Sequence, residues 1–383
     1  MKIAIATFAS MPNPPVLGGA VESLIDVICT QNESQHKLDI DIFSVYHPKA
    51  NIESKKYHFT KFNYYKKKSM KKWSCKNIAY KLFKVSLLDR NMKKLVRDIN
   101  KESYDFVIVT SIIRELKIIF SEISSPVIWY LHGDAKSVLP DKDLSQIVYK
   151  CIAVLTVSEF IRKRINTVKP RCPVITVLNC IDIEPVCEKN EIEIRRTIRK
   201  KAGVSENEKL FLYVGRITPI KGILELIQAF TEVDLKDTKL LIVGSPDLDS
   251  EKEYYQQLKI ESNKNIIFYG YVEHEKLNEI YCAADCVVAP SVCKEAALLI
   301  GGEALRCKKK VIATDIGGIP EYVYGENFIL ISYDSNFKEN IKEALCQAEG
   351  NIQYIGKPEL DKFSPSSFYQ NFVNALTELK RKI

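Results

Sequence analysis

The 383-residue sequence lacks apolar runs of the length that a membrane-spanning helix requires. Apolar stretches such as 286–290 and 296–300 are only five residues long. The N-terminal segment combines one lysine with an apolar region that is too short for a secretory signal peptide. Residues 2–8 are therefore expected to form a buried strand, and the protein is expected to be cytoplasmic.

Paired cysteines are also missing, because none of the eleven cysteines belongs to a CxxC motif. The nearest spacing is that of Cys282 and Cys286, and the five histidines do not cluster with them. Scattered cysteines in odd number are typical of a reduced protein, so we expect mostly buried thiols and no metal site. With 46% apolar and 27% charged residues, the chain has the composition of a soluble globular protein, and its length predicts two domains.

The net charge of +8 is unevenly distributed. Residues 55–101 hold sixteen Lys and Arg against two Asp, a net charge of +14, so the remainder carries −6. Eight aromatic residues are interleaved with these cations. Such a segment suits an anionic membrane surface or a nucleic-acid strand, and the alternative is a solvated basic face.

Short β-branched runs alternate with helical patterns through both halves of the chain, which predicts α/β domains with parallel sheets. The junction is expected near Asn179–Asp182, giving domains 1–180 and 181–363. The expected strands are 2–8, 38–45, 106–110, 127–131, 152–157, 174–178, 210–214, 240–243, 266–269, 286–289, 311–313 and 328–331. The main expected helices are 21–30, 76–100, 191–202, 223–230 and 364–380, and 349–361 is expected to be a linker.

The segment 290–323 is the strongest candidate for a ligand site. A helix is expected to open near residue 296, just after Glu295, and Glu303 follows eight residues later, which spans ~12 Å along a helix. Unpaired N–H groups at the helix start would bind an anion. These belong to Ala297, Leu298 and Leu299. Two carboxylates flanking an anion cradle predict a site for a sugar joined to a nucleoside diphosphate; the alternative is a surface helix with two solvated glutamates.

Three further motifs follow expected strands. Arg216 and Lys221 lie in one loop, where both could contact a diphosphate and stabilise its negative charge as a metal ion does. The alternative is a solvated basic loop. His132 lies at the carboxyl end of a strand, where open α/β sheets bind ligands, or else is a hydrogen-bonded structural residue. Gly18 and Gly19 lie in a strand–turn–helix unit of the kind that binds nucleotides or phosphate.

Taken together, several motifs resemble those of family four of the retaining glycosyltransferases. They are GGAVE at 18–22, TVSEFIRKRI at 156–165, NCID at 179–182, GRITPIKG at 215–222, KEAALLIGGEAL at 294–305, ATDIGGIPEYV at 313–323 and FSPSSFYQNFVNAL at 363–376. The resemblance covers nearly the whole chain. It implies a GT-B fold, with two Rossmann-like domains whose parallel sheets face a central cleft, and a C-terminal helix, 364–383, that packs back on the first domain.

The resemblance also implies roles for individual residues. Arg216 and Lys221 would bind the donor diphosphate, Glu295 the hydroxyls of the donor sugar and Glu303 those of the ribose. The backbone N–H groups of Leu298 and Leu299 would approach the phosphate. Gly18 and Gly19 would close on the donor sugar and acceptor, and His132 would lie beside the reacting sugar.

The chain departs from the family pattern at two pairs of residues. Ala296 and Ala297 replace the usual glycine–aromatic pair, and Gly301 and Gly302 stand where bulkier apolar residues are common. The departures leave donor identity open, whereas the four charged residues are retained.

We therefore expect a retaining, metal-independent, hexosyltransferase-type enzyme that uses a nucleotide sugar, UDP-linked in our prediction, and no cofactor. The acceptor would be a glycan or lipid-linked intermediate of surface polysaccharide synthesis. Residues 55–101 would bind anionic lipid peripherally, at the inner face of the cell membrane. The alternatives are a non-catalytic GT-B subunit that binds a glycan or a partner glycosyltransferase, and a nucleic-acid-binding protein, although no nucleic-acid motif accompanies the charge.

Overall fold

The computed structural model describes residues 1–7, 11–66, 90–113, 115–246, 249–323, 325–355 and 361–383. It divides into two compact units, Met1–Cys180 with Lys362–Ile383, and Ile181–Asp361. None of the helices in the described ranges combines the length and apolarity needed to cross a membrane. Residues 67–89 lie outside the described ranges. They include most of the basic segment's central cations and the first part of the helix expected at 76–100.

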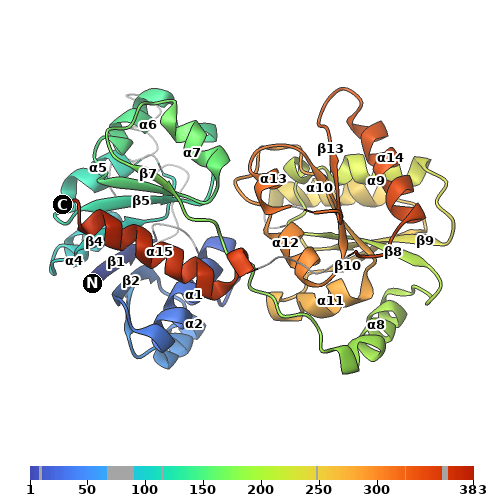
Figure 1. The fold of residues 1–383 in the computed structure, drawn as a ribbon, viewed down its shortest axis with the longest axis horizontal. Helices are drawn as coiled ribbons and strands as arrows, with labels where there is room; N and C mark the ends of the chain where they lie inside the picture. Colours follow the sequence, from blue (N-terminus) through green and yellow to red (C-terminus); the bar gives the residue numbers. More distant parts are fainter. Residues whose placement is uncertain (8–10, 67–89, 114, 247–248, 324, 356–360) are drawn as a thin grey trace. The chain divides into compact units, whose positions relative to one another are not determined.

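The first unit contains a parallel seven-stranded sheet with the strand order β3-β2-β1-β4-β5-β6-β7 (Figure 1). Its strands are β1 (Lys2–Ala6), β2 (Asp39–Val45), β3 (Thr60–Tyr65), β4 (Phe106–Val109), β5 (Val127–Leu131), β6 (Ala153–Thr156) and β7 (Val174–Thr176). Its helices are α1 (Ala20–Gln35), α2 (Pro48–Glu53), α4 (Arg90–Ile99), α5 (Leu116–Glu122), α6 (Asp141–Val148), α7 (Glu159–Asn166) and α15 (Pro365–Lys380). The central strands are almost wholly buried, as expected for a parallel sheet covered on both faces.

The C-terminal helix α15 belongs to this first unit and lies beside α1 (Figure 1). Ser364 caps its start by accepting a hydrogen bond from the Ser367 N–H at 3.1 Å, and Pro365 takes the first helical position. The Tyr369 hydroxyl donates to Asn32 Oδ1 of α1 at 2.6 Å, and Phe372 stacks on Tyr130 of β5. Residues far apart in sequence therefore form one core.

The second unit contains a parallel six-stranded sheet with the order β10-β9-β8-β11-β12-β13. Its strands are β8 (Lys209–Val214), β9 (Thr238–Val243), β10 (Ile266–Gly270), β11 (Cys286–Ala289), β12 (Lys310–Thr314) and β13 (Phe328–Ile331). Its helices are α8 (Glu188–Ala202), α9 (Ile223–Glu232), α10 (Asp249–Glu261), α11 (Leu277–Ala283), α12 (Leu299–Arg306), α13 (Ile319–Tyr322) and α14 (Phe337–Gly350). The alternation of strands and helices expected from the sequence is confirmed in both units.

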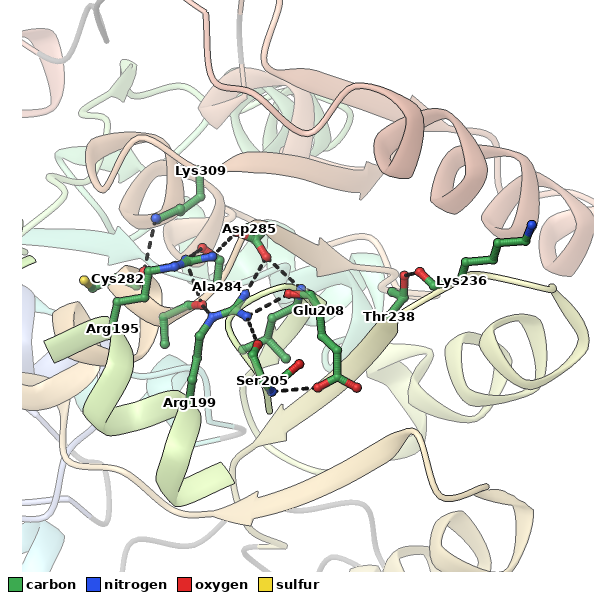
Figure 2. Close-up of polar contacts among 12 residues, drawn as sticks. Arg195, Arg199, Ser205, Glu208, Lys236, Thr238, Cys282, Ala284, Asp285 and Lys309 are labelled. Atoms are coloured by element: carbon green, nitrogen blue, oxygen red, sulfur yellow. Dashed lines mark hydrogen bonds and ion pairs between the residues drawn. The ribbon is translucent and has the colours of Figure 1, made fainter. Parts of the chain in front are cut away.

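A buried cluster of cations fastens α8 to the end of α11 (Figure 2). Arg195 and Arg199 donate hydrogen bonds to the carbonyls of residues 282–284, at 3.0–3.2 Å, and each pairs with one oxygen of Asp285. Lys309 donates to the Cys282 carbonyl at 3.3 Å. These carbonyls end α11 and have no helical partner, so the cluster satisfies groups that would otherwise be buried without hydrogen bonds.

Two expectations about elements were wrong. The first missed β3, which lies at one edge of the sheet within the basic segment. The second placed the start of the helix after Glu295 at residue 296, whereas α12 begins at Leu299. Residues 295–298 are loop, so the ~12 Å helical separation between Glu295 and Glu303 does not apply.

Candidate functional site

The loops that follow β8 and β11 bring Lys221 and Glu295 together. Lys221 ends the short 3₁₀ helix η3 (Pro219–Lys221), and its Nζ lies 2.8 Å from both carboxylate oxygens of Glu295. The two side chains are 22% and 13% exposed, so a ligand can still reach them. Arg216 lies in the same loop, where its carbonyl accepts a hydrogen bond from the Tyr213 hydroxyl at 2.8 Å. The structure thus places the predicted cations and the predicted carboxylate at adjacent strand ends.

Gly222 explains how these two loops come so close. Its φ is 67°, and a Cβ at this position would lie 1.9 Å from the Pro290 carbonyl oxygen. The Val292 N–H also donates to the Ile220 carbonyl at 3.0 Å, which joins the loops through their backbones. Only glycine permits this approach, because any side chain would meet backbone atoms that cannot move aside.

The backbone of Glu295 is held from its other side by the glycine pair that follows β12. Gly317 has a φ of 65°, and a Cβ there would lie 2.5 Å from the Glu295 carbonyl oxygen. The Gly318 N–H donates to that same oxygen at 2.7 Å. Gly317 and Gly318 of the motif at 313–323 therefore fix the backbone position of Glu295.

Replacement of Gly317 by alanine is expected to lower the free energy of unfolding by about 3 kcal/mol, combining positive-φ strain with a backbone clash. Any activity that depends on Glu295 should fall as well, because Glu295 would shift. Gly203 is the matched control, since its φ is 71° and no heavy atom lies within 4 Å of its Cβ position. Gly203→Ala should cost about 1 kcal/mol in urea unfolding and leave that activity unchanged. Equal losses in the two variants would show that Gly317 does not support Glu295.

Ser291 is a site residue that the sequence reasoning missed. Its Oγ donates a hydrogen bond to Glu295 Oε1, and the residue is only 2% exposed. Together with Lys221, it fixes the orientation of the carboxylate. A polar residue directly after a buried strand was the available signal, because that strand end lies at the ligand-binding edge of a parallel sheet.

Glu303 lies on the second turn of α12 in a different environment. It is 6% exposed, and its Oε2 accepts a hydrogen bond of 2.7 Å from the hydroxyl of the fully buried Tyr281. His274 Nε2 lies 3.4 Å from its Oε1. Hence Glu303 is neither a solvated surface acid nor a partner of Glu295, and it is held by residues of η4 (His274–Lys276) and α11.

The start of α12 differs from the expected one by about one helical turn. Leu298 is the N-cap residue without a side-chain cap, and Leu299 is the first helical residue. The N–H groups at the first three helical positions, 299–301, cannot make helical hydrogen bonds. The N–H groups able to bind an anion are therefore those of residues 299–301 rather than those of Ala297–Leu299. Leu298 itself is buried.

The glycines at 301 and 302 are explained by packing. A Cβ on Gly302 would lie 2.4 Å from Ile181 Cδ1, and one on Gly301 would lie 2.9 Å from Leu298 Cδ2. The segment entering the second unit thus packs directly on the α12 backbone. Gly302 serves that contact, whereas Gly301 leaves room for the side chains of Leu298 and Val323.

In the first unit, Gly18 and Gly19 precede α1 with φ values of 76° and 105°. The carboxylate of Glu22 folds back over Gly19, because a Cβ there would lie 2.2 Å from Glu22 Oε2. Glu22 is 5% exposed, and its burial raises the pKa of the carboxyl group. The loop therefore requires glycine and covers a buried acid that the sequence reasoning did not assign.

His132 follows β5 and packs on Tyr130, with ring centroids 4.2 Å apart. Both ring nitrogens are enclosed and have no hydrogen-bond partner among the residues that the structure describes. Burial lowers the pKa of His132 to about 3, so the imidazole is neutral at physiological pH. The alternative of a hydrogen-bonded structural histidine finds no support in this environment.

Comparison with known proteins finds a family model and several related sequences. Residues 194–352 match the family model of glycosyl transferases group 1. A lipopolysaccharide 1,2-N-acetylglucosaminetransferase of Salmonella typhimurium is 30% identical over 52% of this chain and 51% of that enzyme, so the match spans about half of its length. A putative glycosyltransferase of Bacillus subtilis, YtcC, is 25% identical over 91% of this chain and 84% of that protein.

Solved structures match over the whole chain. HepE of Anabaena, solved in complex with UDP-glucose, gives a TM-score of 0.70 with 16% identity, covering 100% of this chain and 98% of that one. The lipopolysaccharide outer core galactosyltransferase WaaB gives a TM-score of 0.63 with 17% identity, covering 99% of each chain. The predicted GT-B class is therefore confirmed, with a parallel sheet in each of two α/β units. The match to the group 1 glycosyl transferase model lies within the second unit and covers less than half of the chain.

Proposed function

On the premise that residues 194–352 match group 1 glycosyl transferases, we propose that this protein is a retaining glycosyltransferase of family four. It transfers a sugar from a UDP-linked donor to a glycan or lipid-linked acceptor of surface polysaccharide synthesis. The observation that carries the proposal is the ion pair of Lys221 and Glu295, held at the carboxyl ends of β8 and β11. The UDP-glucose complex of HepE, a protein of the same fold, supports the choice of donor.

In the proposed mechanism, the cations of the 215–222 loop act on the leaving diphosphate. Breaking the bond between sugar and phosphate places negative charge on the phosphate oxygen, and Arg216 and Lys221 stabilise that charge electrostatically. Unpaired N–H groups at the start of α12, including that of Leu299, add donors for the phosphate. These fixed positive charges supply the role that a metal ion has in other transferases, so we propose metal-independent transfer.

The two glutamates have separate roles. Glu295, oriented by Ser291 and Lys221, accepts hydrogen bonds from the hydroxyls of the donor sugar. Glu303, oriented by Tyr281, accepts hydrogen bonds from the hydroxyls of the ribose. A carboxylate that has already lost its freedom to rotate binds hydroxyls at a lower entropic cost than a mobile one.

We assign the acceptor side of the reaction to the first unit, residues 1–180 with the C-terminal helix, and the donor side to residues 181–361. Gly18 and Gly19 close on the donor sugar and the acceptor. We place His132 beside the reacting sugar, as a neutral imidazole with one donor and one acceptor nitrogen. The leaving phosphate helps to deprotonate the acceptor, and the sugar retains its anomeric configuration.

The test is a screen of donor hydrolysis and transfer across UDP-, GDP-, ADP- and dTDP-sugars, with and without EDTA. We expect release of UDP from at least one UDP-sugar, unchanged by EDTA, and a product with the donor's anomeric configuration by NMR. Release of another nucleotide would correct the donor, and loss of activity in EDTA would contradict metal independence. Release of no nucleotide at all would favour the non-catalytic subunit.

The described part of the basic segment supports a place at an anionic membrane. Helix α4 buries Leu95, Val96 and Ile99. Its remaining surface carries four exposed cations, which are Arg90, Lys93, Lys94 and Arg97. A helix with one buried apolar face and a cationic outer face suits electrostatic attraction to acidic lipid headgroups. We propose that α4 contacts the inner face of the cell membrane, where a lipid-linked acceptor would lie.

Charge reversal of Lys93 and Lys94 to glutamate should release the protein from vesicles of acidic phospholipid, measured by co-sedimentation. Raising the salt from about 0.05 M to about 0.5 M should do the same to the unmodified protein, because ions screen exposed charges. The matched control reverses Lys200 and Lys201, two exposed lysines of α8. Equal loss of binding in both double variants would make the effect one of net charge rather than of α4.

A further inference from the structure

The imidazole of His274 faces the carboxylate assigned to the ribose. The residue begins η4, directly before α11, and its Nε2 lies 3.4 Å from Glu303 Oε1. The other oxygen, Oε2, accepts the Tyr281 hydroxyl at 2.7 Å. The His274 side chain is 45% exposed and that of Glu303 only 9%, so solvent reaches the imidazole more readily than the carboxylate.

The charges around His274 are mostly negative. Glu303 of α12, Asp182 of the segment preceding α8, and Glu275 of η4 all favour its protonated form. Asp182 is itself partly buried, near Glu184 and the compensating cation Arg306, and burial raises its pKa. The hydrogen bond to Glu303 is the largest of the effects that raise the pKa of His274 above its ordinary value of 6.5. Protonation of the imidazole is therefore favoured relative to that of a free histidine.

We propose that His274 is a positioning residue for Glu303 and makes nucleotide affinity depend on pH. The proposal rests on the proposed function, in which Glu303 binds the ribose. When protonated, His274 donates to Oε1 and holds the carboxylate in one orientation, with Tyr281 on Oε2. It also offsets negative charge beside the binding site of an anionic nucleotide. When His274 is neutral, its Nε2 can carry a lone pair instead of a proton. The ring nitrogen that faces the carboxylate then has no hydrogen to donate.

The direction of the effect follows from the raised pKa. A group whose pKa is raised by its partner makes its contribution below that pKa and loses it as pH rises through it. UDP should thus bind more tightly at about pH 6 than at about pH 9. The expected difference is about two- to fivefold in the dissociation constant, the range that a partly exposed ion pair provides. By reciprocity, UDP binding should raise the pKa of His274 further.

The experiment measures the UDP dissociation constant calorimetrically between about pH 6 and about pH 9 in the full-length protein and three variants. His274→Gln should bind UDP more weakly than the unmodified protein at low pH and equally tightly at high pH. Asp182→Asn should keep a pH dependence, because His274 is still present. His58→Gln removes an exposed histidine of the first unit and should reproduce the unmodified profile. Titration of the phosphates of UDP is common to all four proteins and cancels in their ratios.

NMR titration of the His274 ring protons in the unmodified protein provides a second measurement that no variant can confound. A pKa above 6.5 that rises on addition of UDP would support the proposal. Parallel affinity profiles for the unmodified protein and His274→Gln, or a His274 pKa unaffected by bound UDP, would overturn it. If the unmodified protein binds neither UDP nor GDP, ADP or dTDP at any pH, the proposed function fails as well. The two failures are therefore distinguishable.

Discussion

Glu295→Gln and Lys221→Ala are each expected to reduce sugar transfer by about a hundredfold or more, because each removes a charge that acts on the donor. Glu295→Gln keeps the shape of the side chain but loses the ionised acceptor for sugar hydroxyls. Lys221→Ala removes a cation from the leaving diphosphate and leaves Glu295 with Ser291 alone as its side-chain partner among the contacts described above. Steady-state transfer and circular dichroism, measured side by side, separate a catalytic loss from unfolding.

The double variant gives a sharper result than either single variant. Residues in direct contact act as a unit, so the combined loss should be well below the product of the two single losses. Lys338→Ala is the matched control, since it breaks an exposed ion pair with Glu232 in the same unit. It should leave transfer unchanged. Full activity in Glu295→Gln with its fold intact would remove Glu295 from the reaction.

Arg199→Ala is expected to have the largest effect on stability. The Arg199 side chain is 1% exposed, and it donates to the carbonyls of Ala283, Ser205 and Glu208 and to Asp285 (Figure 2). Its removal leaves a mostly buried carboxylate and several carbonyls without one of their donors. Loss of one partner of a buried ion pair costs about 3–5 kcal/mol, which urea unfolding would detect as a lower midpoint.

Arg196 offers the comparison within the same helix. It pairs with Glu206 at 2.8 Å, and both side chains are more than 60% exposed, at 63% and 64%. Arg196→Ala should therefore cost less than about 1 kcal/mol. If Arg199→Ala destabilised the protein no more than Arg196→Ala does, Arg195 and Lys309 would be sufficient to hydrogen-bond the carbonyls at the end of α11.

The fold was predictable because its central strands are buried on both faces and read as short β-branched runs. The edge strand β3 was not, since its sequence TKFNYY carries a lysine and an asparagine and is mostly half-buried. Edge strands have one neighbour and tolerate polar residues, so period and composition give a weaker signal there. The same residues were attributed only to a basic segment.

The start of α12 shows how tertiary contacts override local preference. Residues 295–298, with the sequence EAAL, are good helix formers and predict an earlier start. The Glu295 carbonyl instead accepts a hydrogen bond from Gly318, and the close backbone of Gly317 holds it in the loop. A contact between residues more than twenty positions apart cannot be deduced from the periodicity of one segment.

The charged residues of the candidate site were identified from their motifs, but their partners were not. Ser291, Tyr281 and His274 contribute hydroxyls or an imidazole to the two glutamates, and each comes from a different element. Tyr281 and His274 do not stand out by residue type at their positions in the sequence, whereas Ser291 follows a buried strand. Their roles emerge only when the parallel sheet brings the ends of its strands together.

The most direct test of the central claim is amide hydrogen exchange of the protein with and without UDP. The proposed site predicts slower exchange in two segments of the second unit. These are residues 215–222 and residues 295–303, where the N–H groups at the start of α12 have no helical partner. Protection of both segments on addition of UDP would support the claim. Unchanged exchange in both segments, at a UDP concentration that saturates binding, would contradict it.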